Sequence, residues 1–240
     1  LTQEEIDFKC RKVLAAKYDV GLNKLAPVSR INLMEDLNSA EAELVKRKLI
    51  EASLTLLENQ NDIIPLKRLD TLKIACLTVG ESTVTPFQEM LSKYTKTDNF
   101  FLPEQFSEEE LIAVKAKLQD YNLVIAGLHL YESKTRRSMQ VGSLQKAKPE
   151  RPYGLSNETE NLLDYLSNNK KSIVVFFSSP YALTEVRDFT PPAGLIMAYQ
   201  KDSLVQELAA QQIFGGIGAL GKLPVTLGNY YKMGNGLNIS

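Results

Sequence analysis

Few residues of this chain have the chemistry that metal or disulfide sites need. The 240 residues include no tryptophan, a single histidine (His129) and two cysteines, Cys10 and Cys76. Two cysteines cannot form a disulfide framework, and both fall in apolar patterns where we expect small buried side chains. With one histidine and no C-x-x-C or H-E-x-x-H spacing, the sequence predicts no metal site.

The sequence also lacks an excess of charge of one sign and a long hydrophobic run. Its 28 Lys and Arg residues and 29 Asp and Glu residues give a net charge of −1. No basic field is therefore available to attract nucleic acid or an anionic membrane surface. No apolar run approaches the roughly 20 residues that cross a bilayer, so we expect no membrane span. The 44% of apolar residues is the proportion of an ordinary globular protein.

The chain opens at Leu1 rather than methionine, directly before a helix start. Thr2 and Glu5 have the spacing of a capping box, and apolar residues follow at helical spacing as far as Gly21. A second helix is predicted from Asn38 to about residue 59, after an irregular stretch at 22–37. We interpret Leu1 as a processed terminus or the boundary of a piece, so no targeting segment can be read from it.

Apolar runs of strand length alternate with helical patterns through the rest of the chain. The runs lie at 72–79, 100–102, 123–126, 173–177 and 195–198, and the helical patterns, each starting at a serine, lie at 107–118, 156–166 and 203–214. This alternation predicts an α/β fold with a doubly wound, mostly parallel sheet and helices on both faces. The expected architecture is a flavodoxin-like α/β sandwich preceded by N-terminal helices.

The longest stretch without clear periodicity, 131–155, follows the predicted strand at 123–126. Ligands of open α/β sheets bind at the carboxyl ends of the strands. A loop of this length is either functional or a solvated surface segment. Its charged residues are mainly cationic: Glu132, Lys134, Arg136, Arg137, Lys146, Lys148 and Arg151. His129 stands at the same edge, where a lone histidine is more often a structural hydrogen-bonding group than a catalyst.

Two glycine-containing motifs suggest phosphate binding, and neither has the required context. Residues 216–221 match G-x-G-x-x-G. A dinucleotide site needs a strand before these glycines and a helix after them, whereas here a helix precedes and a strand-like run at 223–227 follows. The turn at 80–85 offers hydroxyls, but Glu81 would repel an anion, so we interpret it as a polar strand-to-helix turn. We therefore expect no bound cofactor.

The C-terminal part of the sequence resembles a known family. Residues 214–226, FGGIGALGKLPVT, resemble the FG-x-x-x-P-x-GKLPVT signature near the end of the second domain of family 3 glycoside hydrolases, with Ala219 in place of the usual proline. Residues 179–181 (SPY) are similar to the family's NPY step, and 198–214 to its AY…A…LFG spacing. We interpret the glycines as structural and expect Pro224 to begin an edge strand.

The N-terminal end resembles the same family. Residues 5–22 are similar to the helix that closes the family's first, barrel domain, and 54–66 to the lead-in to its second domain. The resemblance thus implies that 1–37 are the end of a missing barrel domain with its linker. Residues 38–240 would then form the second α/β domain as one globular unit.

The resemblance also implies an activity that this chain would lack alone. Family members hydrolyse β-glycosides with retention, which requires two carboxyl groups about 5 Å apart. In the family the nucleophile lies on the (β/α)8 barrel, so we expect no catalytic residue here and no activity of the isolated chain. The expected partners are that barrel and, in the full enzyme, a β-linked glycoside. A periplasmic or secreted location is suggested by the family alone.

Two branches of the family differ in their acid/base group. In β-N-acetylglucosaminidases a barrel histidine–aspartate pair supplies it, and in β-glucosidases a glutamate of the second domain does. Glu132 is the alternative candidate for that glutamate, but Arg136 and Arg137 would depress its pKa, the wrong direction for a general acid. We therefore favour the N-acetylglucosaminidase-like branch, with His129, Arg136 or Arg137 near substrate. A third hypothesis is an independent flavodoxin-like binding module with a deep pocket at the sheet's carboxyl edge.

Overall fold

The structure is a computed structural model that describes residues 2–24, 29–131, 151–169 and 171–239. It divides into two compact units, Leu1–Leu44 and Val45–Ser240. Within the described residues, no helix is both long and apolar enough to cross a membrane.

The N-terminal unit is helical. Helix α1 (Gln3–Asp19) begins at the predicted capping box, in which Thr2 Oγ1 accepts from the Glu5 N–H at 3.3 Å and Glu5 Oε2 accepts from the Thr2 N–H at 3.0 Å. A 3-10 turn, η1 (Leu22–Lys24), and the short α2 (Leu33–Leu37) follow. Cys10 is exposed on α1, so the prediction that it is buried is wrong, whereas Cys76 is buried as expected.

Helix α3 (Ala40–Ser53) is shorter than the sequence predicted, and a strand replaces its last part. Ser39, rather than Asn38, caps it through a 3.2 Å bond from the Ala42 N–H to Ser39 Oγ. The chain then forms β1 (Thr55–Asn59), antiparallel to β6 (Gly194–Met197). The two leucines assigned to the helix, Leu56 and Leu57, point to opposite faces of the sheet and enter different core clusters.

The core of the second unit is a six-stranded sheet among the described residues, with the order β1-β6-β5-β4-β2-β3. Besides β1 and β6, its strands are β2 (Ile74–Val79), β3 (Thr97–Leu102), β4 (Leu123–Leu128) and β5 (Ser172–Phe176). All neighbours pair in parallel except β1 with β6. The prediction of a mostly parallel sheet is therefore confirmed, with β1 as its antiparallel edge.

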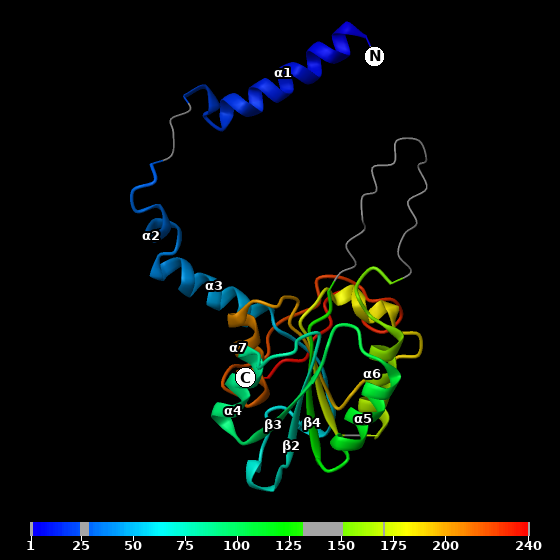
Figure 1. The fold of residues 1–240 in the computed structure, drawn as a ribbon. Coiled ribbons are helices and arrows are strands. Elements are labelled where there is room, and N and C mark those ends of the chain that lie inside the picture. The colour runs from blue at the N-terminus through cyan, green and yellow to red at the C-terminus, as the bar shows by residue number, and fades with distance from the viewer. Residues whose placement is uncertain (1, 25–28, 132–150, 170, 240) are drawn as a thin grey trace. The chain divides into compact units, whose positions relative to one another are not determined.

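Helices cover both faces of the sheet, as predicted (Figure 1). One face carries α4 (Pro86–Tyr94) and α7 (Ser203–Ile213), and the other carries α5 (Glu108–Leu118) and α6 (Asn157–Asn169). The serine caps of α5 and α6 are confirmed by bonds from the Glu110 N–H to Ser107 and from the Thr159 N–H to Ser156. In α7 the cap is Asp202 instead of Ser203. Three further 3-10 turns connect the strands: η2 (Gln60–Asp62), η3 (Leu69–Thr71) and η4 (Pro180–Glu185).

The segment after α7 packs back onto the β1 edge without forming a regular strand. The edge strand predicted at Pro224 is absent from the described residues, where only single bridges occur, such as Leu56 with Leu237 and Leu227 with Tyr231. Gly221 has a packing reason: a Cβ there would lie 2.4 Å from the Leu54 carbonyl oxygen. The glycine therefore lets this segment cross the chain where it enters β1.

Candidate functional site

The topological switch point of the sheet lies between β2 and β4. From β2 the chain goes to β3 on one side and later returns to β4 on the other, so the connections diverge at the carboxyl ends of these two strands. Ligands of doubly wound sheets bind at such a point. The residues that follow β2 and β4 therefore define the candidate site.

At the switch point, Gly80 lies directly against the backbone of His129. Its φ is +95°, and a Cβ there would lie 2.3 Å from the His129 carbonyl oxygen. The Thr85 hydroxyl accepts from the Gln88 N–H and caps α4. The turn thus joins strand β2 to helix α4, as the sequence predicted.

The side chain of His129 is fully buried beneath this edge. Its ring stacks on Phe177 with centroids 4.6 Å apart. Neither ring nitrogen has a hydrogen-bond partner within the described part of the chain. Burial lowers the pKa of His129 to about 4, with lesser effects from Glu81, which raises it, and Lys201, which lowers it. The imidazole is therefore neutral near pH 7 and packs as an aromatic ring.

Three polar residues from three strand ends meet above His129, and we call them the Tyr131 cluster. The Tyr131 hydroxyl donates to Glu81 Oε1 at 2.6 Å, and Lys201 Nζ lies 2.8 Å from the centre of the Tyr131 ring. The hydrogen bond to Glu81 raises the pKa of Tyr131 to about 12. Burial lowers the pKa of Lys201 to about 8, against the opposing charges of Glu81 and Glu104. The cluster thus combines an acceptor carboxylate, a protonated phenol and a lysine that loses its proton readily.

Only part of the candidate site could be predicted from the sequence. His129 lies directly after β4, as the apolar run at 123–126 indicated. Glu81 and Lys201 were not assigned to a common site, although each follows a predicted strand. Glu132, Arg136 and Arg137 lie outside the described residues, so the structure places none of them.

The described residues offer no evident place for a metal ion or a dinucleotide. No group of three or more histidine, cysteine, aspartate or glutamate side chains within the described ranges could hold a metal ion. The glycines at 216–221 follow α7, and from there to residue 239 the chain forms no helix. This context agrees with the sequence argument against a dinucleotide fingerprint.

Comparison with known proteins gives one curated relative and several solved structures, whereas no family model matches. A putative β-xylosidase of Formosa agariphila is 27% identical over 92% of this chain, which spans only 31% of that protein. A family 3 β-N-acetylglucosaminidase from Paenibacillus sp. has a TM-score of 0.65 at 17% identity, with 95% of this chain and 40% of that chain covered. The chain resembles the C-terminal α/β domain of family 3 glycoside hydrolases. A β-glucosidase from Listeria innocua shares this fold with a TM-score of 0.57 at 19% identity, over 95% of this chain and 33% of its own.

The family 3 resemblance thus covers nearly the whole chain but a minor part of each relative. The chain spans about a third of the curated relative that it matches. The larger part of each of those proteins has no counterpart in this chain.

Proposed function

We propose that this chain is the non-catalytic second domain of a retaining β-glycosidase of the β-N-acetylglucosaminidase type, and that it shapes the mouth of an active site on a companion (β/α)8 barrel. The observation that carries the proposal is that the matches cover nearly all of this chain but less than half of each relative. The matches take in 92–95% of this chain but only 31–40% of the first relatives. A part that recurs whole within longer enzymes is expected to act together with the remainder.

The chemistry of retention supports a role that depends on a companion. A retaining glycosidase places two carboxyl groups about 5 Å apart, one as nucleophile and one as acid/base. At the switch point, Glu81 already accepts the Tyr131 hydroxyl, and Lys201 is close enough for the Glu81 charge to raise its pKa. Glu81 is therefore already engaged by two neighbours of its own chain, and the proposal gives it no catalytic role.

The choice of branch rests on two arguments. Arg136 and Arg137 follow Glu132 closely and would favour its ionised form, which suits a general acid poorly. The β-N-acetylglucosaminidase fold also fits with a TM-score of 0.65, against 0.57 for the Listeria β-glucosidase. The alternative is a β-glucosidase-type enzyme in which Glu132 supplies the acid/base group. An independent flavodoxin-like binding module is the second alternative.

We also propose that 1–37 belong to the end of the barrel domain and its linker, with 38–240 as the second domain. Helix α1 exposes several large apolar side chains, among them Phe8, Val13, Leu14 and Tyr18. Such a set is typical of a surface that packs against another partner. The companion barrel is the partner that the coverage of the relatives supports.

The experiment compares the 240-residue chain with the same chain extended by its upstream coding sequence. On aryl β-N-acetylglucosaminide and aryl β-glucoside, we expect no turnover by the chain alone and N-acetylglucosaminidase activity of the extended protein. Glu132→Gln should leave that activity in place. Turnover by the chain alone that is lost in Glu132→Gln would favour the β-glucosidase alternative, and an extended protein without activity would contradict the proposal.

A further inference from the structure

A polar hollow lies on the segments that follow β4 and β5. It has a volume of about 330 Å³ and is lined by Arg151, Pro152, Tyr153, Thr184, Glu185 and Arg187. Pockets for small ligands begin at about 300 Å³, so this hollow is large enough for a small molecule of one or two rings. None of these residues was assigned a role from the sequence.

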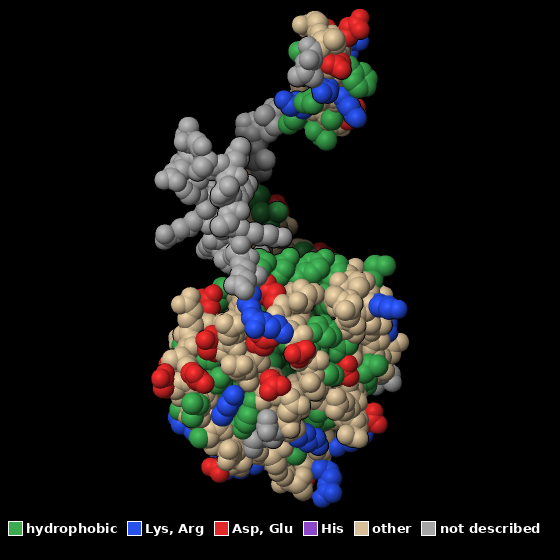
Figure 2. Space-filling view, turned by 90° about the vertical axis from the view of Figure 1, so that its right-hand side faces the viewer, with side chains coloured by type: hydrophobic (Ala, Val, Ile, Leu, Met, Phe, Trp, Pro, Cys, Tyr) green, Lys and Arg blue, Asp and Glu red, His purple; other side chains and the backbone are tan. Residues whose placement is uncertain are grey.

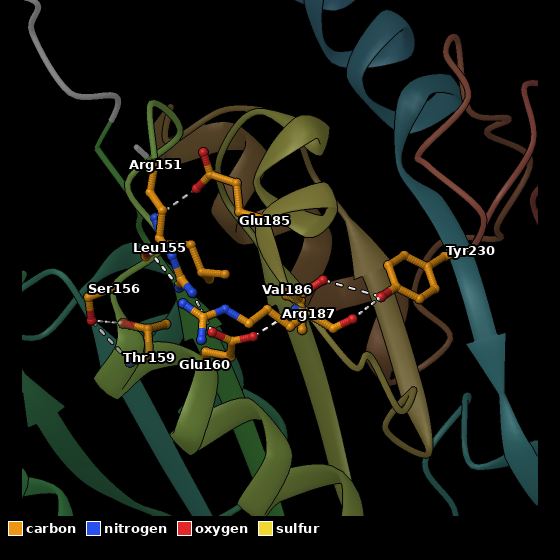
Figure 3. A network of polar contacts seen from close by, with 9 residues as sticks. All are labelled: Arg151, Leu155, Ser156, Thr159, Glu160, Glu185, Val186, Arg187 and Tyr230. Carbon is orange, nitrogen blue, oxygen red and sulfur yellow. Dashed lines mark hydrogen bonds and ion pairs between the residues drawn. The ribbon is translucent and has the colours of Figure 1, made fainter. Parts of the chain in front are cut away.

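One wall of the hollow is fixed by two glutamates (Figure 3). Glu185 accepts the Tyr153 N–H at 2.9 Å and the Leu155 N–H at 3.3 Å, which ties η4 to the segment at 151–155. Arg151 pairs with Glu160 at 2.6 Å, and their side chains are only 15% and 17% exposed. A charge-assisted bond with so little exposure is stronger than an ordinary surface ion pair, so this wall is pre-formed.

Arg187 lies on the opposite wall. Its backbone is held by hydrogen bonds, whereas its side chain is exposed. The Arg187 N–H donates to the second oxygen of Glu160 at 2.7 Å. The Tyr230 hydroxyl lies 2.9 Å from the Arg187 carbonyl oxygen, to which it can donate. The exposed guanidinium of Arg187 forms no hydrogen bond or ion pair with any other described side chain, although its charge helps to lower the pKa of Glu160. Among the described residues its donors therefore have no partner, and they can bind a ligand.

The charges of the described residues at the hollow are equal in number. Arg151 pairs with Glu160, and the lining also holds one further arginine, Arg187, and one further glutamate, Glu185. Acidic and basic side chains are also interspersed over the face of the molecule seen in Figure 2, with no field of one sign. A site without net charge has no electrostatic preference for an anion or a cation, so a neutral ligand fits it best.

The groups that line the hollow match a sugar ring. Arg187 offers planar donors, and Glu185 keeps lone pairs beyond those that bind the two backbone N–H groups. Tyr153 adds an aromatic face, and its ring lies 5.5 Å from that of Tyr181 at a tilt of 30°. A pyranose presents hydroxyls that donate and accept around its rim and C–H groups on its faces. Adjacent donors, acceptors and an aromatic face are what such a ring requires.

We propose that this hollow is a binding site for a neutral saccharide, with Arg187 donating to its hydroxyls and Tyr153 contacting a face of the ring. The inference deepens the proposed function, from which it takes the β-linked class of sugar. Binding to the isolated chain does not depend on the companion barrel, so it can fail or succeed separately from hydrolysis.

The experiment records amide NMR spectra of the ¹⁵N-labelled 240-residue protein during titration with N,N′-diacetylchitobiose, cellobiose or xylobiose. Parallel titrations with sulfate and glucuronate test the anion alternative. We expect at least one disaccharide to shift the amide signals of residues 153 and 184–187 with a millimolar Kd. Arg187→Gln should weaken binding roughly tenfold, the loss of about one charge-assisted hydrogen bond, while its backbone contacts with Glu160 and Tyr230 remain.

The matched control is Lys93→Gln, which removes one exposed cation from α4 on the opposite face of the sheet. It should leave the Kd unchanged. Three outcomes overturn the inference: no shift with any disaccharide, disaccharide binding that Arg187→Gln leaves unchanged, or shifts caused by sulfate or glucuronate alone. Hydrolysis by the upstream-extended protein remains a separate readout of the proposed function.

Discussion

The Tyr131 hydroxyl donates a 2.6 Å hydrogen bond to Glu81 Oε1 and so joins the chain after β4 to the chain after β2. These two strands are neighbours in the sheet, although their residues are 50 positions apart in the sequence. The bond lies across the topological switch point, where the parallel connections diverge. It fixes a tyrosine and a carboxylate at the edge where this fold binds ligands.

Replacing Glu81 should lower the pKa of the Tyr131 hydroxyl. In Glu81→Gln the charged acceptor is lost, so we expect the pKa of Tyr131 to fall from about 12 toward its ordinary value of about 10. Because the folded-state pKa is raised, the bond stabilises the fold fully below pH 10 and is lost as pH rises through 12. NMR titration of the labelled tyrosine ring, assigned with Tyr131→Phe, measures the shift. Glu104→Gln is the control, since Glu104 acts only through its charge and should have a smaller effect.

The buried His129 should make the protein less stable in mild acid. Its folded-state pKa is about 4 and the ordinary value is about 6.5, so the unfolded chain takes up the proton first. The contribution of neutral His129 to the free energy of unfolding is complete above pH 6.5 and is lost as pH falls through 4. The loss amounts to about 3 kcal/mol at most. Denaturant unfolding between pH 7 and 4 measures it, and His129→Leu should flatten the profile in this range. If His129→Leu keeps the same pH dependence of unfolding as the original chain, the acid sensitivity comes from other groups.

Gly80 should not tolerate a side chain. In Gly80→Ala the new Cβ would meet the His129 carbonyl at 2.3 Å, in a backbone conformation with φ of +95°. We expect a loss of about 3 kcal/mol in the free energy of unfolding, from steric overlap and backbone strain together. Gly228→Ala is the matched control, because Gly228 also has a positive φ but no atom within 4 Å of the added Cβ. It should cost about 1 kcal/mol, so equal losses would contradict the steric argument.

The elements that the sequence predicted well are those with local signals. The capping boxes of α1 and α5 lie within four consecutive residues, and the buried strands are continuous apolar runs. Strand β1 was misassigned because its leucines continue the helical spacing of α3. Only pairing with β6, about 140 residues later, determines that this segment is extended. Propensity gives way to tertiary pairing at such positions.

In the candidate site, too, contacts between residues far apart in the sequence could not be predicted. The position of His129 at a strand end could be predicted, since parallel strands share their carboxyl edge. That its ring is buried against Phe177 depends on the packing of β4 against β5, which no local pattern encodes. Likewise, Glu81 and Lys201 meet Tyr131 only because β2, β4 and β6 end at one edge. The sequence therefore predicts the location of the site better than its contacts.

The Arg151–Glu160 pair should stabilise the second unit more than an exposed pair does. Burial raises the pKa of Glu160, but hydrogen bonds from the Arg187 N–H and Arg151, with both arginine charges, outweigh it, so the net pKa is lowered. We expect Glu160→Gln to cost about 2 kcal/mol near pH 7, a difference that shrinks as pH falls below about 4.

The control for this prediction is Glu51→Gln, which breaks the Arg47–Glu51 pair of α3. Its side chains are 39% and 32% exposed, so the loss should stay below about 0.5 kcal/mol. Denaturant unfolding of both variants at pH 7 and at about pH 3 distinguishes the buried pair from the exposed pair. A loss in Glu160→Gln no larger than in Glu51→Gln would mean that this ion pair does not hold the wall of the hollow lined by Arg151 and Arg187. The rigidity assumed for that site would then have to come from the Glu185 contacts alone.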